Sequence, residues 1–216
     1  MKNCNSFVRL TKTWLVLALG APCLAQDAST PKPDAKADWM SDPQMMATMM
    51  AMATPGENHK MLEATVGSWT YKGKMWMHPD APPMEYAGTT TTKSLMDGRY
   101  FLSEHIGKMA MPGPDGKMME MEFKGMATEG YDNAKKKFIA SWIDNMGTGM
   151  MLMEGTYDPA TKTVTYLGEE EPVPGMKIKV RQTIAYTDKD HRKMEFYEVH
   201  GGAEVKMMVI DYIRST

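Results

Sequence analysis

Methionine most distinguishes this sequence, and its thioether could do chemistry. The chain has 26 methionines among 216 residues. Met45, Met46, Met49 and Met50 stand together in a segment with a helical period. Thioethers are soft ligands that select Cu(I), and they also react reversibly with oxidants. The favoured interpretation is simpler: methionine replaces leucine and isoleucine as flexible core filler.

The histidines form no local metal-binding motif. They are His59, His78, His105, His191 and His200. No two are four residues apart on an expected helix or two apart on an expected strand, so the usual metal spacings are missing. His105 is the one expected to face the inside of the fold, which makes it the candidate ligand if a haem were bound. The sequence predicts no cofactor.

Catalytic motifs are also missing: the sequence has no serine elbow, Walker loop, zincin helix or dinucleotide fingerprint. Glu104 and Asp144 could face inward as a carboxylate pair, although buried acids in barrels more often pair with an arginine such as Arg99 or Arg181. The glutamate run 169–171 is expected in a solvated loop. The sequence favours a non-catalytic protein, with an enzyme of unidentified substrate as an alternative.

The first 25 residues resemble a secretory signal. Arg9 and Lys12 precede an apolar run that begins at Trp14 and is too short to cross a bilayer as a helix. We expect cleavage after Ala25 and export to the periplasm or the extracellular space. Cys23 leaves a lipid anchor open as the alternative.

Both cysteines, Cys4 and Cys23, lie in this leader, so the mature chain would contain no disulfide and no reactive thiol. Cleavage would remove three bases and no acid, leaving 22 bases against 27 acids and a net charge near −5. This charge gives nucleic acid no reason to bind. No second hydrophobic segment follows, so we expect no transmembrane segment in the mature chain.

The rest of the chain divides into three parts. Residues 26–40 are rich in proline, alanine and charge, and are expected to form a flexible linker. Residues 41–65 are expected to form a methionine-rich helical cap whose apolar face docks on the mouth of the next domain. From residue 66 to 216 the hydrophobic period changes to two, which predicts a β domain.

About ten antiparallel strands are expected in that domain, separated by hairpin signals such as Asp97-Gly98 and Gly201-Gly202. Ten strands in up-and-down order leave two exposed edges unless the sheet closes. The predicted fold class is therefore an all-β, up-and-down antiparallel barrel with a short N-terminal helical cap. The expected strands are 66–77, 86–96, 99–109, 118–130, 137–144, 149–157, 162–169, 176–187, 191–199 and 203–214.

Gly67-Ser68-Trp69, at the start of the first expected strand, resembles the G-x-W signature of the lipocalin and wider calycin group. In that group the tryptophan lies across the closed end of the barrel, beneath an arginine from the far end of the chain. The resemblance implies a calycin-like, lipocalin-like barrel in which Arg214 covers Trp69. Such a cation–π contact contributes about 0.5–2 kcal/mol.

A second resemblance covers nearly the whole mature chain. It rests on ATPGENHK at 53–60, LMDGRYF at 95–101, GYDNAKKKF at 130–138 and SWIDNMGTGMM at 141–151, together with DAPP at 80–83 and GTYDPATKT at 155–163. These segments are similar to a bacterial family known as domain of unknown function 1579. The resemblance implies a calycin-like barrel and brings no catalytic residues.

These observations predict that the barrel binds a small apolar or amphipathic molecule in its interior. An interior filled by its own side chains, on a barrel that works through its surface, is an alternative. Methionine-based handling of Cu(I) or oxidants, through Met45, Met46, Met49 and Met50, is another. The candidate interior residues are Trp69, Tyr71, Met75, His105, Phe123, Trp142, Met194 and Phe196.

Overall fold

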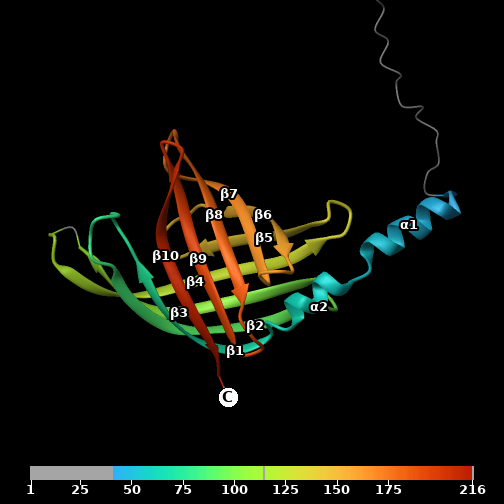
Figure 1. The fold of residues 1–216 in the computed structure, drawn as a ribbon, viewed down its shortest axis with the longest axis horizontal. Helices are drawn as coiled ribbons and strands as arrows, with labels where there is room; N and C mark the ends of the chain where they lie inside the picture. Colours follow the sequence, from blue (N-terminus) through green and yellow to red (C-terminus); the bar gives the residue numbers. More distant parts are fainter. Residues whose placement is uncertain (1–40, 114, 216) are drawn as a thin grey trace, which may run out of the picture. The chain divides into compact units, whose positions relative to one another are not determined.

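The structure is a computed structural model that describes residues 41–113 and 115–215, so the expected leader and linker lie outside the described residues. Two helices, α1 (Pro43–Ala53) and α2 (Glu57–Glu63), precede ten strands (Figure 1). The strands are β1 (Gly67–Met75), β2 (Met84–Leu95), β3 (Tyr100–Pro112), β4 (Met118–Asp132), β5 (Lys137–Asp144), β6 (Met151–Asp158), β7 (Thr163–Val173), β8 (Met176–Tyr186), β9 (His191–His200) and β10 (Ala203–Arg214).

The strands form one closed antiparallel barrel. Each strand pairs with its neighbours in sequence, and β1 also pairs with β10. Closure joins the first and last strands in register from Trp69 opposite Arg214 to Met75 opposite Met208. The predicted all-β, ten-stranded barrel is confirmed. One local prediction is wrong, because β7 runs on through the glutamates at 169–171, which were expected in a loop.

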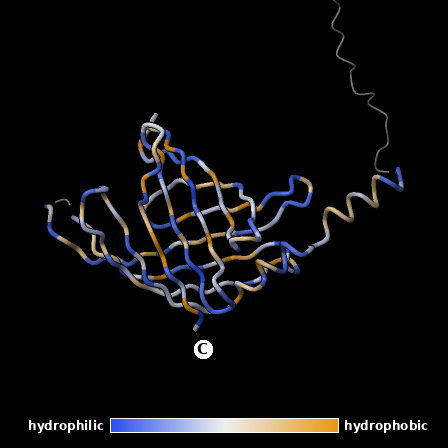
Figure 2. The backbone as a smooth tube through the Cα atoms, in the orientation of Figure 1, coloured by the Kyte–Doolittle hydropathy of each residue, from blue (hydrophilic) through white to orange (hydrophobic). Residues whose placement is uncertain are grey.

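The barrel follows from residue alternation, since successive side chains on a strand point to opposite faces. On β1, Trp69 and Tyr71 are buried, whereas Thr70 and Lys72 between them are exposed. Figure 2 shows hydrophobic and hydrophilic residues alternating along the strands. Because the buried positions of each strand lie on one face, a shift of one residue in register would expose them, which fixes the pairing.

Helix α2 closes one end of the barrel. Its Leu62 is fully buried, and its buried His59 accepts a hydrogen bond at Nδ1 from the Gly56 backbone N–H at 3.0 Å. The His59 ring also meets Tyr131 of β4 edge-on, with ring centroids 5.9 Å apart. Leu62 joins a core cluster of this end, whose other most deeply buried members are Phe101, Phe138, Val164 and Tyr166.

Two turns of the barrel hold the segment that links the helices. Arg99, just before β3, donates from Nε to the Ala53 carbonyl at 3.1 Å. Asn133, in the turn after β4, donates from Nδ2 to the carbonyls of Met52 and Thr54, both at 2.9 Å. Three of the segments that carry the family resemblance, 53–60, 95–101 and 130–138, therefore meet at the closed end and have a structural role there.

Helix α1 does not dock as expected. None of its residues is buried, and the methionines of its apolar stripe are 39–68% exposed. Arg99 and Asn133 of the barrel form hydrogen bonds to the C-terminal end of α1, and the extended backbone at Thr54 separates α1 from α2. Of the expected cap, only α2 covers the barrel. Among residues 41–113 and 115–215, no helix is long and apolar enough to span a membrane.

The Trp69 ring lies between two arginines at the closed end. The guanidinium carbon of Arg214 is 4.2 Å from the ring centroid and that of Arg192 is 4.5 Å from it. The indole Nε1 donates to the Thr65 carbonyl at 2.8 Å, which fixes the plane of the ring. Arg214 therefore covers Trp69 in the manner of the G-x-W group, and Arg192 stacks on it as well.

Arg214 also holds the start of the barrel by hydrogen bonds. Its guanidinium donates to the carbonyls of Val66 at 2.8 Å, Ala64 at 2.6 Å and Lys189 at 3.1 Å. One side chain from β10 thus satisfies backbone acceptors just before β1 and in the turn before β9. Hydrogen bonds that involve a charged group are each worth roughly 1.5–3 kcal/mol.

The first prediction is that Arg214→Gln lowers the free energy of unfolding by about 2–4 kcal/mol, because it removes the ring contact and most of these hydrogen bonds. Urea denaturation followed by tryptophan fluorescence measures the change. The matched control is Lys189→Gln, which removes a charge from a side chain that is 90% exposed and makes only a 3.8 Å ion pair with Asp190. Equal stabilities of the two variants would contradict this role for Arg214.

Candidate ligand-binding site in the barrel interior

The eight predicted interior residues all lie on the inward faces of their strands. Trp69, Tyr71 and His105 are buried, and the other five are half-buried. The structure does not bring them into one cluster. Trp69 belongs to the closed end, where its two faces are covered by arginines, so it is not free to form a wall for a ligand.

An aromatic group surrounds His105 in the middle of the barrel. Trp142 lies closest, with ring centroids 5.2 Å apart, and Tyr71 and Tyr212 lie 6.1 and 6.2 Å away. The Nδ1 of His105 is hydrogen bonded to the Thr90 hydroxyl at 2.9 Å. In this packing the imidazole faces aromatic rings, so a haem at His105 does not fit unless Trp142 or Tyr71 moves.

Burial determines the charge state of His105. Loss of hydration, together with the positive charge of Arg192, lowers its pKa from the usual 6.5 to about 3. The imidazole is therefore neutral at physiological pH, and its hydrogen bond to Thr90 is one between uncharged groups.

Methionines surround the end of the barrel opposite α2. Register pairs Met84 with Met75 and Met75 with Met208 across β2, β1 and β10. On β3 and β4, Met109 is paired with Met121. These side chains lie on the inward faces, and all but Met109 are partly exposed. We call this set, Met75, Met84, Met109, Met121 and Met208, the methionine mouth.

Half-buried aromatic residues continue the methionine mouth inward. Phe196 of β9 is paired with Met208, and Phe123 of β4 stacks on Trp142 with ring centroids 6.2 Å apart and an interplanar angle of 20°. Trp142 donates from Nε1 to Asp144 at 2.7 Å. Asp144 therefore does not pair with Glu104, which lies outside the barrel and forms an ion pair with Lys93. The carboxylate pair considered from the sequence is absent.

Two charged residues in the interior were not predicted. Glu129 of β4 is 6% exposed and Arg192 of β9 is 7% exposed. Arg192 stands in a run of charged residues after a turn, which suggests a solvated loop. The sequence nevertheless contains a signal for the inward position of Arg192, because Arg192 alternates with Met194 and Phe196, which are expected on the inside. By the same parity, Glu129 follows Phe123 on the inward face of β4.

The buried acid is tied to a tyrosine. Tyr166 donates its hydroxyl to Glu129 Oε1 at 2.9 Å, and both residues are buried. Burial raises the pKa of Glu129, although the positive charge of Arg192 and the Tyr166 hydrogen bond oppose the rise. No ion pair joins Glu129 to Arg192 among the described residues, so the two groups interact only over a longer distance.

Several buried polar atoms in the interior have no hydrogen-bond partner in the described part of the chain. They are the hydroxyls of Tyr71, Tyr86 and Tyr186 and the Nε of Arg192. Burial raises the pKa of each of these tyrosines, so their hydroxyls keep their protons. Buried polar groups in folded proteins are nearly always paired, so a group of unpaired ones indicates bound water or a ligand.

Glycines make room for the large rings of the interior. A side chain at Gly73 would meet the ring of Tyr86 at 2.2 Å, and one at Gly88 would meet the Tyr71 hydroxyl at 2.4 Å. The ring of Trp142 likewise covers Gly125. The aromatic residues thus lie against neighbouring strands, which lets a ten-stranded barrel hold many of them.

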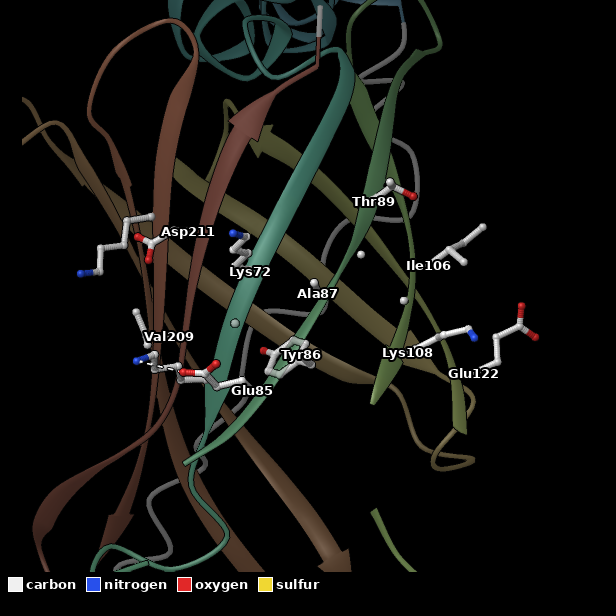
Figure 3. A pocket seen from close by; sticks show the side chains of 15 residues that line it. Lys72, Glu85, Tyr86, Ala87, Thr89, Ile106, Lys108, Glu122, Val209 and Asp211 are labelled. Atoms are coloured by element: carbon white, nitrogen blue, oxygen red, sulfur yellow. Dashed lines mark ion pairs between the residues drawn. The ribbon is translucent and has the colours of Figure 1, made fainter. Parts of the chain in front are cut away.

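A groove of about 980 Å³ lies on the outer face of the barrel, over β1, β2, β3 and β10 (Figure 3). Charged side chains of both signs line it, including Lys72, Lys108, Glu122 and Asp211. These side chains are exposed and several form ion pairs at the surface, which contribute little and select no particular ligand. The unpaired polar groups point inward, so we place the candidate site in the interior and not in this groove.

The copper alternative rested on Met45, Met46, Met49 and Met50, all of which are exposed on α1. Among the described residues, no cluster of histidines and carboxylates could hold a metal ion. Copper binding by the α1 methionines stays a prediction.

The closed ten-stranded antiparallel barrel, with a tryptophan beneath an arginine from the opposite end of the chain, places this protein among the calycin-like barrels. Residues 54–214 match the family described as protein of unknown function (DUF1579), and the chain belongs to that family. The resemblance seen in the sequence is confirmed.

Comparison with other proteins supports the fold. No curated protein matches the chain. Among solved structures it is similar to Rv2717c from M. tuberculosis, with 13% identity and a TM-score of 0.53 over 76% of this chain and 100% of that one. An S-type phycobiliprotein lyase, CPES from Guillardia theta, has 10% identity and a TM-score of 0.48 over 74% of this chain and 93% of the other. At these identities, the likeness to Rv2717c shows the fold alone.

The second prediction concerns acid stability. Because the pKa of His105 is about 3 in the folded chain and 6.5 when unfolded, only the unfolded chain binds this proton between those values. Stability is therefore lost as the pH falls through this window, by up to about 1.4 kcal/mol per pH unit. Urea titrations between pH 6.5 and pH 4 should give a shallower slope for His105→Gln than for the wild type.

The control for this experiment is His191→Gln, which removes a histidine that is 52% exposed at the start of β9. If His105→Gln and the wild type lose stability in parallel as the pH falls, His105 is not buried in its neutral form.

Proposed function

We propose that this protein is a non-catalytic binding barrel that holds one small amphipathic molecule in its interior. The observation that carries the proposal is the methionine mouth, a set of inward-facing apolar side chains at the end opposite α2, of which all but Met109 are partly exposed. Exposed apolar patches of this kind mark binding sites in soluble proteins. Methionine is suited to the task because its flexible, polarisable side chain adapts to guests of different shape.

The interior behind the mouth supports an amphipathic guest over a purely apolar one. Phe123, Trp142 and Phe196 provide an apolar wall next to the mouth, whereas Arg192 and the unpaired hydroxyl of Tyr186 lie deeper. Ligand sites commonly combine apolar walls with a few convergent polar groups that orient the ligand. A molecule with a polar end and an apolar tail would match this order.

The third prediction tests the mouth with N-phenyl-1-naphthylamine, a neutral apolar probe that fluoresces when it leaves water. The wild type should show a saturable rise in fluorescence. Met75→Lys and Met208→Lys should each weaken binding about tenfold or more, because a charge at the mouth disfavours apolar contacts.

Met126→Lys is the matched control, since Met126 is exposed on the outer face of β4. It should bind the probe as the wild type does. The absence of a saturable signal in the wild type, or equal losses in the inward and outward variants, would contradict the proposed site.

We also propose that the protein is exported and works in the periplasm or outside the cell. The support lies in the sequence, where the basic Arg9 and Lys12 precede an apolar run that ends near Ala25. A barrel built without cysteine suits either redox environment, because its stability does not depend on disulfides.

The fourth prediction is that expression of the full chain in a bacterium with a periplasm yields a mature protein that begins at Gln26. Cell fractionation and N-terminal sequencing check this. A variant that lacks residues 2–25 should stay in the cytoplasm. An acyl group on Cys23 would instead establish the lipid anchor, and an intact leader on a cytoplasmic protein would contradict export.

A further inference from the structure

Arg192 is a buried cation without a hydrogen-bond partner. It is 7% exposed, its Nε is buried and unpaired, and no other described residue forms a hydrogen bond or an ion pair with it. Its guanidinium carbon lies 4.5 Å from the Trp69 ring centroid and 4.7 Å from that of Tyr212. The rings stabilise the faces of the guanidinium, but its N–H groups point along its edge and are left without acceptors.

Tyrosines flank Arg192 in one row across the sheet. Register places Tyr186 of β8 opposite Arg192, Arg192 opposite Tyr212 of β10, and Tyr212 opposite Tyr71 of β1. Residues directly opposite on antiparallel strands point to the same face, roughly 5 Å apart. The hydroxyls of Tyr186 and Tyr71 are themselves buried and unpaired. The Tyr71 hydroxyl lies against Gly88 and Gly107 of β2 and β3, on the side of β1 away from Arg192. The row therefore offers one fixed positive charge and, beside it, one free hydroxyl donor from Tyr186.

The nearby acid does not complete this group. Glu129 accepts the hydroxyl of Tyr166 at 2.9 Å and makes no ion pair with Arg192. Burial also raises the pKa of Glu129, which weakens it as a counter-ion. On the other side, His105 is uncharged and engaged with Thr90. No described side chain thus supplies the acceptor that the edge of Arg192 requires.

The chemistry of the missing partner follows from these donors. A guanidinium has donors only, and its planar edge matches a carboxylate through two parallel hydrogen bonds. A cation would be repelled, and a wholly apolar guest would leave the donors unpaired at a high cost. We propose that Arg192, assisted by the hydroxyl of Tyr186, binds the carboxylate of a small amphipathic acid. This inference rests on the proposed function and specifies its ligand class.

The position of the row agrees with such a ligand. Tyr71 and Met75 lie on the same face of β1, four residues apart, which corresponds to about 13 Å of strand. A carboxylate held at Arg192 would leave an alkyl chain directed past the aromatic wall to the methionine mouth. The polar end is then satisfied at the bottom of the site, and the apolar tail meets apolar side chains along its length.

The fifth prediction compares dodecanoate with dodecan-1-ol, which has the same chain and no charge, by isothermal titration calorimetry on the cleaved or full-length protein. Octanoate and hexadecanoate extend the series in chain length. The wild type should bind the acid more tightly than the alcohol. Arg192→Gln should weaken dodecanoate binding about ten- to a hundredfold and leave dodecan-1-ol binding within about twofold.

Two further sets of variants complete the test. Lys193→Gln, the neighbouring residue on the outer face, removes the same charge and should change neither ligand. The variant Tyr186→Phe keeps the ring and removes only a hydroxyl that has no partner in the described part of the protein. It should keep its stability and lose about three- to tenfold in dodecanoate affinity. It therefore tests the carboxylate site even if Arg192→Gln does not fold.

The outcomes separate the two proposals. Binding of neither compound by the wild type would overturn the proposed function together with this inference. Equal binding of acid and alcohol, binding of the alcohol alone, or unchanged dodecanoate affinity in folded Arg192→Gln would overturn only the carboxylate site. In these cases the unpaired donors are satisfied by internal water. If Arg192→Gln does not fold, unchanged dodecanoate affinity in Tyr186→Phe has the same meaning.

Discussion

The stack of Arg192, Trp69 and Arg214 joins the first strand of the barrel to the last two. One indole ring lies between two positive charges, and the backbone carbonyls around it accept the donors of Arg214. The two arginines stack on the same ring but have different roles. Arg214 has partners for its donors and serves the architecture, whereas Arg192 uses only its face and leaves its edge toward the interior. The contacts that close this end of the barrel therefore also position Arg192 in the candidate site.

Much of the fold could be predicted because hydrophobic and polar residues alternate along the strands. Trp69 and Tyr71 alternate with Thr70 and Lys72, and similar patterns recur in every strand, with short turn signals between them. Closure of the barrel could be predicted because a sheet with two unpaired edge strands is unfavourable, and this argument does not require the contacts between side chains. The docking of α1 could not be predicted in the same way. An apolar stripe shows that a helix could dock, but the path of the chain at Thr54 decides whether it does.

The candidate site was harder to predict because its polar members contradict a simple hydrophobicity pattern. Arg192 and Glu129 stand at inward positions by parity, yet their charge suggests solvent. Their residue type predicts an exposed position, whereas their place in the alternation of the strand predicts the inward position that the structure shows. The unpaired state of Arg192 depends on distances between strands, which no single strand encodes. The methionines show the converse case: their type was conspicuous, but only the register gathers Met84, Met75 and Met208 at one end.

The order of strand pairing has a consequence for how the barrel forms. Nine of its ten pairings join strands that follow one another in sequence, so each can form as a hairpin with a short loop. The pairing of β1 with β10 alone brings together residues as distant as Trp69 and Arg214. The chain entropy lost on folding is thus concentrated in one late step, and the folding rate should be sensitive to that seam above all others. A change that weakens the seam would leave a curved ten-stranded sheet with two free edges, ready to pair with another copy of itself.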